Sequence, residues 1–138
     1  NAERIIDFIE KAEKQDVKLL VFPELCVTGY TCSDLFLQDI LLQRAMEQVK
    51  KVAEATRGKE IAAIIGFPYK RTGRLYNTAA VVQGGKVLGL VPKLNIPNYG
   101  EFYELRYFVP GPGKAVKVDF LGEEVYFGSW IYRISCLA

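Results

Sequence analysis

The stretch Val17-Lys18-Leu19-Leu20-Val21-Phe22-Pro23-Glu24-Leu25 decides the fold class of this chain. Its apolar run is short, rich in β-branched and aromatic residues, and interrupted only by Lys18, which predicts a strand buried in a sheet. Pro23 has no N–H to donate to a neighbouring strand, so sheet pairing should end there. Glu24 is therefore predicted at the carboxyl end of a strand, where ligands bind in open α/β sheets.

The segments beyond this strand alternate between helical and extended patterns. Apolar residues recur at helical spacing over 2–14 and over a longer stretch, 34–57, which has Ser33 as its candidate N-cap. A second buried strand, over 61–66, is expected to be broken by Pro68. Two hairpins are predicted, over 77–82 with 86–91 around Gly84-Gly85, and over 116–120 with 124–127. This order predicts an α/β sandwich with mixed sheets flanked by helices.

The overall composition is that of one ordinary globular domain. The chain has 138 residues, of which 50% are hydrophobic and 25% charged, enough for a packed core. The net charge is only +2, and acidic and basic residues are interspersed, which argues against a nucleic-acid-binding surface. No apolar run has membrane-spanning length and no secretory signal is seen, so no membrane location is expected.

The three cysteines and the absence of histidine limit the catalytic mechanisms that this chain could use. The three cysteines, Cys26, Cys32 and Cys136, are odd in number and lack metal-ligand spacing, which predicts reduced thiols in a cytosolic protein and no metal site. Histidine is absent, so these residues cannot build a Ser-His-Asp triad, a Cys-His dyad or a histidine metal site. Amide hydrolysis here would have to use carboxylate and lysine chemistry.

Two charged residues occupy equivalent places, each just after a predicted strand and beside a proline. Glu24 is flanked by apolar residues, and partial desolvation would suit its carboxylate to general-base catalysis. Lys93 follows Val91-Pro92, where a fixed ammonium could stabilise a developing oxyanion. From local sequence alone, a turn-capping or arginine-paired carboxylate and a solvated surface lysine remain open alternatives.

The stretch 95–112 is loop-rich and unusually aromatic. It contains Pro97-Asn98-Tyr99-Gly100-Glu101-Phe102-Tyr103-Glu104, in which Tyr99, Glu101 and Tyr103 could line a small polar pocket. The same aromatic side chains could instead pin the loop to the body of the domain. The two interpretations are compatible, because a pinned loop can still present its polar atoms to a ligand.

The motifs around the two charged residues resemble those of a known enzyme superfamily. The segment Phe22-Pro23-Glu24-Leu25-Cys26-Val27-Thr28-Gly29-Tyr30 resembles the surroundings of the general-base glutamate in the nitrilase, or carbon–nitrogen hydrolase, superfamily. Residues 34–38, 91–104, 106–108 and 111–113 resemble specifically its branch of glutaminase domains from glutamine-dependent NAD⁺ synthetases. The resemblance covers nearly the whole chain up to Gly128.

This resemblance implies a nitrilase-like α-β-β-α sandwich, incomplete in this chain, and a set of site residues. Glu24 would be the general base that activates a cysteine thiol, and Lys93 would stabilise the oxyanion. Glu101 would be the second glutamate, which positions the lysine and the departing amine. Tyr30 and Tyr99 would hold the substrate, L-glutamine, whose side-chain amide would be hydrolysed through a thioester to glutamate and ammonia.

The resemblance also implies partners beyond these residues. Ammonia would pass to a carboxyl-terminal synthetase domain of the full-length chain, which uses ATP and magnesium to amidate nicotinate adenine dinucleotide to NAD⁺. No cofactor is implied for residues 1–138, which would form a partial glutaminase domain of a cytoplasmic protein, expected to be a homo-oligomer. The opening Asn1-Ala2-Glu3, without a methionine or a preceding strand, predicts a truncated start.

The nucleophile segment departs from the family pattern. Phe127-Gly128 begin the pattern Phe-Gly-x-x-Ile-Cys-Glu-Asp correctly, but the count from Gly128 places Tyr132 where the cysteine should be. A phenol cannot replace a thiolate at neutral pH, and Cys136 lies too far along the chain. An interrupted or frameshifted gene, a sequence joined from separate pieces, and a degenerate relative would each explain the departure. The chain by itself is predicted to be inactive.

Two other functions remain open at this point. A stand-alone amidase or carbamoylase of the same superfamily would keep the fold and change the substrate, although residues 34–38 and 99–108 favour the synthetase branch. A non-catalytic nitrilase-like assembly module would use its helices for pairing, although one helix face is predicted to belong to the core, namely Leu41, Ala45, Val49 and Val52.

Overall fold

The computed structural model describes residues 1–129, 131 and 132, and it contains the predicted helices and strands in the predicted order. The helices are α1 (Ala2–Glu13) and α2 (Asp39–Glu54), with two 3₁₀ turns, η1 (Ser33–Leu37) and η2 (Glu104–Arg106). The strands are β1 (Leu19–Val21), β2 (Ala62–Arg71), β3 (Arg74–Gln83), β4 (Lys86–Pro92), β5 (Val116–Phe120) and β6 (Glu123–Phe127). Among the described residues, no helix is long and apolar enough to cross a membrane.

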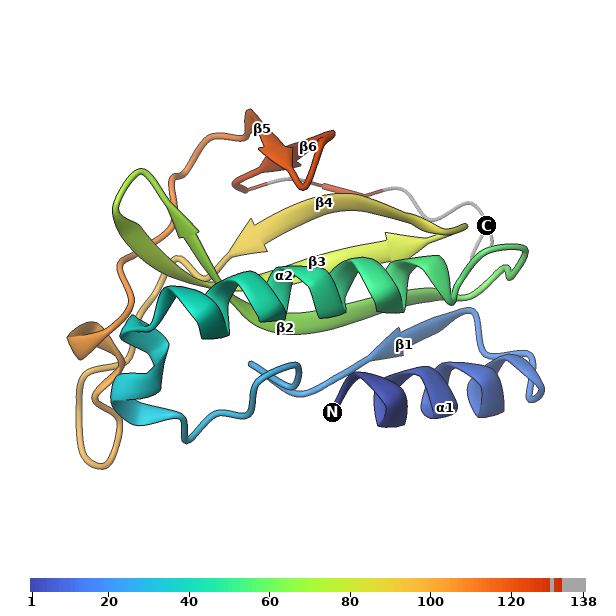
Figure 1. Ribbon diagram of the computed structural model, residues 1–138, viewed down its shortest axis with the longest axis horizontal. Coiled ribbons are helices and arrows are strands. Elements are labelled where there is room, and N and C mark those ends of the chain that lie inside the picture. The colour runs from blue at the N-terminus through green and yellow to red at the C-terminus, as the bar shows by residue number, and fades with distance from the viewer. Residues whose placement is uncertain (130, 133–138) are drawn as a thin grey trace.

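The strands form one six-stranded mixed sheet in the order β1-β2-β3-β4-β6-β5. The pairs β1–β2 and β4–β6 are parallel, and the remaining neighbours are antiparallel. Figure 1 shows α1 and α2 side by side on one face of this sheet. The mixed sheet flanked by helices is thus confirmed, and the described residues supply one sheet and one helical layer of the expected sandwich.

The main core lies between the two helices and the sheet. Ile9 of α1 and Val49 of α2 are fully buried, and they pack in one cluster with Ile65 of β2 and Phe127 of β6. Fully burying one such side chain stabilises the fold by about 1.5–3 kcal/mol. Three members of the predicted core face of the long helix, Ala45, Val49 and Val52, lie in this cluster and are confirmed as core residues, whereas the fourth, Leu41, is half-buried against a second cluster.

The long helix expected over 34–57 is interrupted. Gln38 has an extended backbone (φ −88°, ψ 119°) and separates η1 from α2. Ser33 does not cap a long helix; it is the first residue of η1, with a positive φ of 49°, and the N-cap of η1 is Cys32. The break has a packing reason, because it lets Phe36 point into a second, smaller core that contains Leu25 and Phe108.

The expectation that Pro68 would break the second strand is also wrong, because β2 continues through Pro68 to Arg71. The N–H of Ala62 donates to Lys18, and the carbonyl of Ile64 accepts from Phe22, so the even-numbered residues of β2 direct their backbone groups toward β1. Pairing with β1 stops at Ile64. The nitrogen of Pro68 therefore faces an edge where no strand needs its missing N–H.

The second core fixes the aromatic loop. Phe36 of η1 packs edge-on against Phe108 (ring centroids 5.1 Å apart) and against Tyr107 (5.8 Å). The Asp34 carboxylate accepts hydrogen bonds from Arg106 (3.1 Å) and Tyr107 (2.9 Å). The two segments that favoured the synthetase branch thus contact each other, and this contact positions η2 beside the end of β4.

Candidate active site

Glu24 lies in a tight turn just after β1. The N–H of Phe22 makes the last hydrogen bond to β2, donating to Ile64 at 2.9 Å, before the chain turns. Leu25 is fully buried with a positive φ of 53°, a conformation that costs a non-glycine residue about 1–2 kcal/mol. Burial of its side chain in the second core offsets this strain. The turn is therefore held by packing, and it presents Glu24 at the sheet edge.

Lys93 follows β4 at the same edge. Its backbone N–H donates to the carbonyl of Asn77 on β3 (2.8 Å), and its carbonyl accepts from the N–H of Gly111 (2.9 Å). β1 and β4 both run parallel to β2, because β3 is antiparallel to β2 and to β4. Their carboxyl ends therefore meet at one edge, which explains how residues 69 positions apart converge.

The Lys93 ammonium contacts two carboxylates. Its Nζ donates to both oxygens of Glu24, at 3.1 and 2.9 Å, and to both oxygens of Glu104, at 3.1 and 3.2 Å. Burial lowers the pKa of Lys93, but the hydrogen bonds and charges of Glu24 and Glu104 more than offset this, so the pKa is raised overall. The ammonium is therefore held charged, as stabilising an oxyanion requires.

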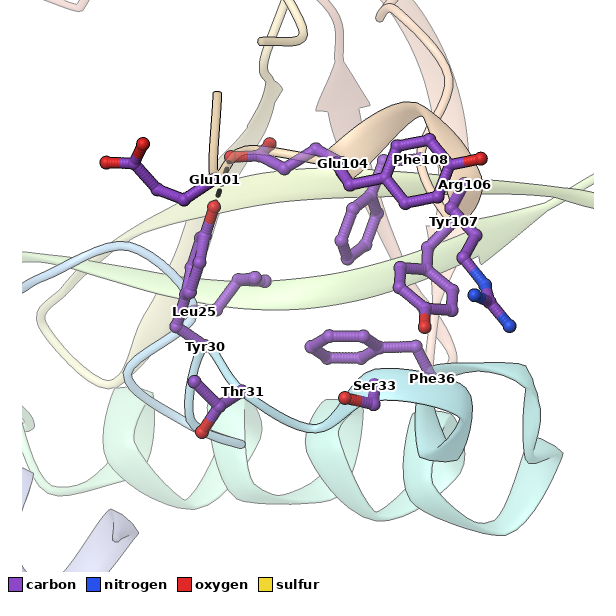
Figure 2. Close-up of a pocket in the computed structure, with 11 residues that line it drawn as sticks. Leu25, Tyr30, Thr31, Ser33, Phe36, Glu101, Glu104, Arg106, Tyr107 and Phe108 are labelled. Carbon is purple, nitrogen blue, oxygen red and sulfur yellow. Dashed lines mark hydrogen bonds between the residues drawn. The ribbon is translucent and has the colours of Figure 1, made fainter. Parts of the chain in front are cut away.

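The second carboxylate on Lys93 is Glu104, where the resemblance implied Glu101. Glu104 begins η2, and its side chain is buried, 6% exposed. Glu101 lies on the exposed loop before η2 and makes no hydrogen bond or ion pair with the described residues. In Figure 2 its carboxylate points away from the hydrogen bond between Tyr30 and Glu104. The 3₁₀ turn η2 therefore places Glu104, three residues after Glu101, against the Lys93 ammonium.

Tyr30 and Asn77 complete the cluster. The Tyr30 hydroxyl donates to Glu104 at 2.8 Å (Figure 2). Burial, followed by the hydrogen bond to Glu104 and nearby negative charges, raises the pKa of Tyr30 to about 12. The Asn77 side-chain amide donates to Glu24 at 2.6 Å and to Glu104 at 3.4 Å. Sequence reasoning missed Asn77, because it begins the predicted strand 77–82 beside another polar residue, Thr78, and nothing in that strand marks its role.

The cluster lies between two open cavities. One has a volume of about 300 Å³, and its lining includes Glu24, Asn77 and Lys93 together with apolar residues of the sheet. The other, drawn in Figure 2, has a volume of about 260 Å³, and its lining includes Tyr30 and Glu104. A substrate could approach the Lys93 ammonium through the first cavity while the second holds the side chains that support Glu104.

The remaining predicted residues lie elsewhere. Tyr99 is exposed and packs against Phe102, at a ring-centroid distance of 5.8 Å. The Tyr132 hydroxyl is buried against Gly89 of β4, without a hydrogen-bond partner among the described residues. Cys26 and Cys32 are free thiols that donate to backbone carbonyls. Cys136 lies outside the described residues.

This arrangement supplies two of the functions that amide hydrolysis needs. Glu24 is a carboxylate with a partly open approach, suited to take a proton from a nucleophile. Lys93 is a fixed cation beside it, suited to stabilise negative charge on a carbonyl oxygen. Among the described residues, no group of three or more histidine, cysteine or acidic side chains could hold a metal ion.

A family profile described as carbon-nitrogen hydrolase matches residues 1–129. The chain belongs to the carbon–nitrogen hydrolase family. The match ends close to Gly128, where the motif resemblance also ends, and it covers every residue of the Lys93 cluster. The two sequence motifs, one around Glu24 and one around Lys93, form the two turns that meet at the sheet edge.

The similar proteins agree on one branch of the carbon–nitrogen hydrolases. The chain is 41% identical to the glutamine-dependent NAD(+) synthetase of Acinetobacter baylyi, over 90% of this chain and 22% of that protein. It is 36% identical to the corresponding synthetase of Mycobacterium tuberculosis, over 94% of this chain and 19% of that protein.

A solved structure supports the same branch. The structure of a glutamine-dependent NAD(+) synthetase from Cytophaga hutchinsonii matches with a TM-score of 0.91 and 32% identity, over 97% of this chain and 23% of that one. The predicted resemblance is thus confirmed, and the chain spans about a fifth of the length of these relatives.

Proposed function

We propose that this domain is part of the glutamine amidohydrolase of a glutamine-dependent NAD⁺ synthetase, which releases ammonia from L-glutamine. The observation that carries the proposal is the Lys93 ammonium held between Glu24 and Glu104 at the sheet edge. The relatives that share this segment are themselves named glutamine-dependent NAD(+) synthetases, which supports L-glutamine as the nitrogen source.

Glu24, Lys93 and Glu104 each have a separate role in the proposed hydrolysis of glutamine. The Glu24 carboxylate takes the proton from a cysteine thiol, which then attacks the side-chain amide carbon of glutamine. Lys93 stabilises the oxygen anion of the tetrahedral intermediate, and Glu104 holds the ammonium in place. As the intermediate collapses, Glu24 passes the thiol proton to the departing nitrogen, so that ammonia leaves and a thioester forms. Water, deprotonated by Glu24, then hydrolyses the thioester to glutamate, and the proton returns to the thiolate.

The proposal places the other partners outside residues 1–138. Ammonia would pass to a synthetase domain of the same full-length protein, which would bind ATP and magnesium and amidate nicotinate adenine dinucleotide. The full-length protein would be cytoplasmic and homo-oligomeric. Tyr30, through its contact with Glu104, and Tyr99, from the exposed loop, are the proposed substrate-binding tyrosines.

The 138-residue chain by itself should not hydrolyse glutamine. The two described thiols are engaged elsewhere: Cys26 donates to Gly66, and Cys32 donates to Thr28 and Gly29. Tyr132 lies against Gly89, and its buried phenol has a raised pKa, so it cannot serve as a nucleophile at neutral pH. A coupled ammonia assay on the purified chain should show no release above that of a glutamine blank.

A chimera tests the function directly. Residues 1–127 replace the corresponding segment of the Acinetobacter baylyi synthetase, which supplies its own remaining residues. The chimera should form NAD⁺ with either glutamine or free ammonia as the nitrogen source. Lys93→Met should reduce glutamine-dependent formation by about 10²-fold or more and leave ammonia-dependent formation unchanged, because only the first route needs the oxyanion to be stabilised.

Lys70→Met is the matched control, since Lys70 is an exposed lysine of β2 paired with Asp39. This variant should leave both the glutamine-dependent and the ammonia-dependent formation of NAD⁺ unchanged. A folded chimera that uses ammonia but never glutamine would contradict the proposed function, as would a Lys93→Met variant with full glutamine-dependent activity.

A further inference from the structure

We infer that Asn77 is a positioning residue that holds the Glu24 and Glu104 carboxylates on the Lys93 ammonium by giving one side-chain N–H to each. The inference rests on the proposed function for its catalytic meaning, because it assigns a new role within the same site. It stands on the contacts of one buried amide with both acids of the cluster.

The donor count of the amide matches its surroundings. An asparagine Nδ2 carries two hydrogens, and Asn77 has two carboxylate acceptors, Glu24 Oε1 at 2.6 Å and Glu104 Oε2 at 3.4 Å. The opposite orientation of the amide would place its oxygen against both carboxylates, where it could only repel them. The cluster itself therefore fixes the direction of the amide.

The charges explain why such a donor is needed. Glu24 and Glu104 bring two negative charges, and Lys93 brings one positive charge, so the three contacting groups carry a net charge of −1. The two carboxylates repel each other across the ammonium that they share. A neutral donor that reaches both reduces this repulsion without a further charge, so the Lys93 ammonium keeps its full positive charge for an oxyanion.

Asn77 is itself fixed with respect to Lys93. Its side chain is on β3 and is buried, 4% exposed, and its backbone carbonyl accepts the N–H of Lys93 at 2.8 Å. One residue therefore holds the lysine backbone with its carbonyl and the two acids with its amide. The Glu24 side chain is 40% exposed, so without the amide hydrogen bond it has room to turn into solvent.

Competitive acetylation of the 138-residue chain tests the inference without substrate or nucleophile. A trace of acetic anhydride modifies each lysine in proportion to its accessible neutral amine, and peptide mass spectrometry gives the ratio of Lys93 to Lys70. In Asn77→Ala, the release of Glu24 weakens one charge-assisted hydrogen bond to the ammonium. The ratio should rise by about threefold or more.

Asn77→Leu separates the hydrogen bond from the bulk of the side chain. Leucine keeps the branched shape but has no N–H, so it should give the same rise, and it decides the matter if the alanine variant does not fold. Gln83→Ala is the matched control, because Gln83 is another amide of β3, bonded to the Glu60 carbonyl. Its ratio should equal that of the parent chain.

An unchanged ratio in either folded variant, Asn77→Ala or Asn77→Leu, would overturn the inference. If the ratio rose in Asn77→Ala but stayed unchanged in Asn77→Leu, space filling would explain the rise. Failure of the chimera to use glutamine would contradict the proposed function while leaving the labelling result intact, so the two ideas fail separately.

Discussion

At the scale of single residues, the site depends on the Lys93 ammonium, which donates to the carboxylates of Glu24 and Glu104. Of these two acids, Glu104 is the buried one. Removing its carboxylate takes one acceptor from each of Lys93, Tyr30 and Asn77; Lys93 and Asn77 keep Glu24, whereas the Tyr30 hydroxyl loses its acceptor. Glu104→Ala should lower the free energy of unfolding by about 1–3 kcal/mol. Glu101→Ala, at an exposed loop position, should change it by no more than about 0.5 kcal/mol. Urea unfolding followed by circular dichroism measures both, and the reverse order would contradict this site geometry.

The Tyr30 phenol reports on the charge of Glu104. Its pKa is raised from an ordinary value of 10.0 to about 12, first by burial and then by Glu104. Because the folded-state pKa lies above the unfolded one, the stability contributed by the neutral phenol is present below pH 10 and lost as the pH rises toward 12.

Glu104→Gln removes the charge and should therefore lower the pKa of Tyr30. Spectrophotometric titration measures this pKa as the difference between each protein and its Tyr30→Phe counterpart. An identical titration of Tyr30 with and without the Glu104 charge would show that the two side chains do not interact.

Single residues differ in how far the sequence reveals them. Glu24 and Lys93 could be placed because each follows an apolar run beside a proline, a local signal of a strand end. The choice between Glu101 and Glu104 depends on a 3₁₀ turn held by contacts with η1, more than 65 positions away in sequence. Asn77 has no local signal of its role, because its partners come from two other segments.

At the scale of elements, the Glu24 turn packs against the backbone of β2. A Cβ at Gly66 would lie 2.4 Å from the backbone nitrogen of Leu25 and 3.2 Å from Cα of Glu24. Gly66→Ala should therefore displace the turn and cost about 1–3 kcal/mol of stability. Gly113→Ala is the control, since a Cβ there meets no atom within 4 Å. Thermal unfolding of the two variants compares them, and equal midpoints would argue against close packing at Gly66.

The contact between η1 and η2 should depend more on packing than on charge. Phe36 is buried between Tyr107 and Phe108, and Phe36→Ala should cost about 3–5 kcal/mol. Asp34 and Arg106 are exposed, so Asp34→Ala should cost no more than about 1 kcal/mol. Chemical unfolding ranks the two variants; a larger loss from Asp34→Ala would mean that the polar contacts hold η2 in place.

Periodicity predicted most elements because each one has its own apolar face. The hairpin around Gly84-Gly85 follows from local turn chemistry and is confirmed. The helix break at Gln38 and the passage of β2 through Pro68 escaped prediction for a common reason. Both depend on what lies beside the segment: a second core that receives Phe36, and a strand edge left unpaired after Ile64.

At the scale of the whole molecule, parallel strands explain why distant motifs form one site. β1 and β4 end at the same edge of the sheet, with β2 and β3 between them, so the turns that follow face each other. The edge also borders a cavity of about 300 Å³ that reaches Glu24 and Lys93. The proposed base, Glu24, and the proposed oxyanion-stabilising cation, Lys93, thus lie where a nucleophile and an amide substrate could meet.

The most direct test of this convergence is an NMR measurement of the Lys93 ammonium in the 138-residue chain. Scalar couplings across hydrogen bonds link the Nζ of a lysine to the carboxyl carbons that accept its protons. The predicted result is a pair of correlations from Lys93 to the side-chain carboxyl carbons of Glu24 and Glu104. A correlation to Glu101 in their place, or an ammonium in free exchange with water and coupled to neither, would contradict the account.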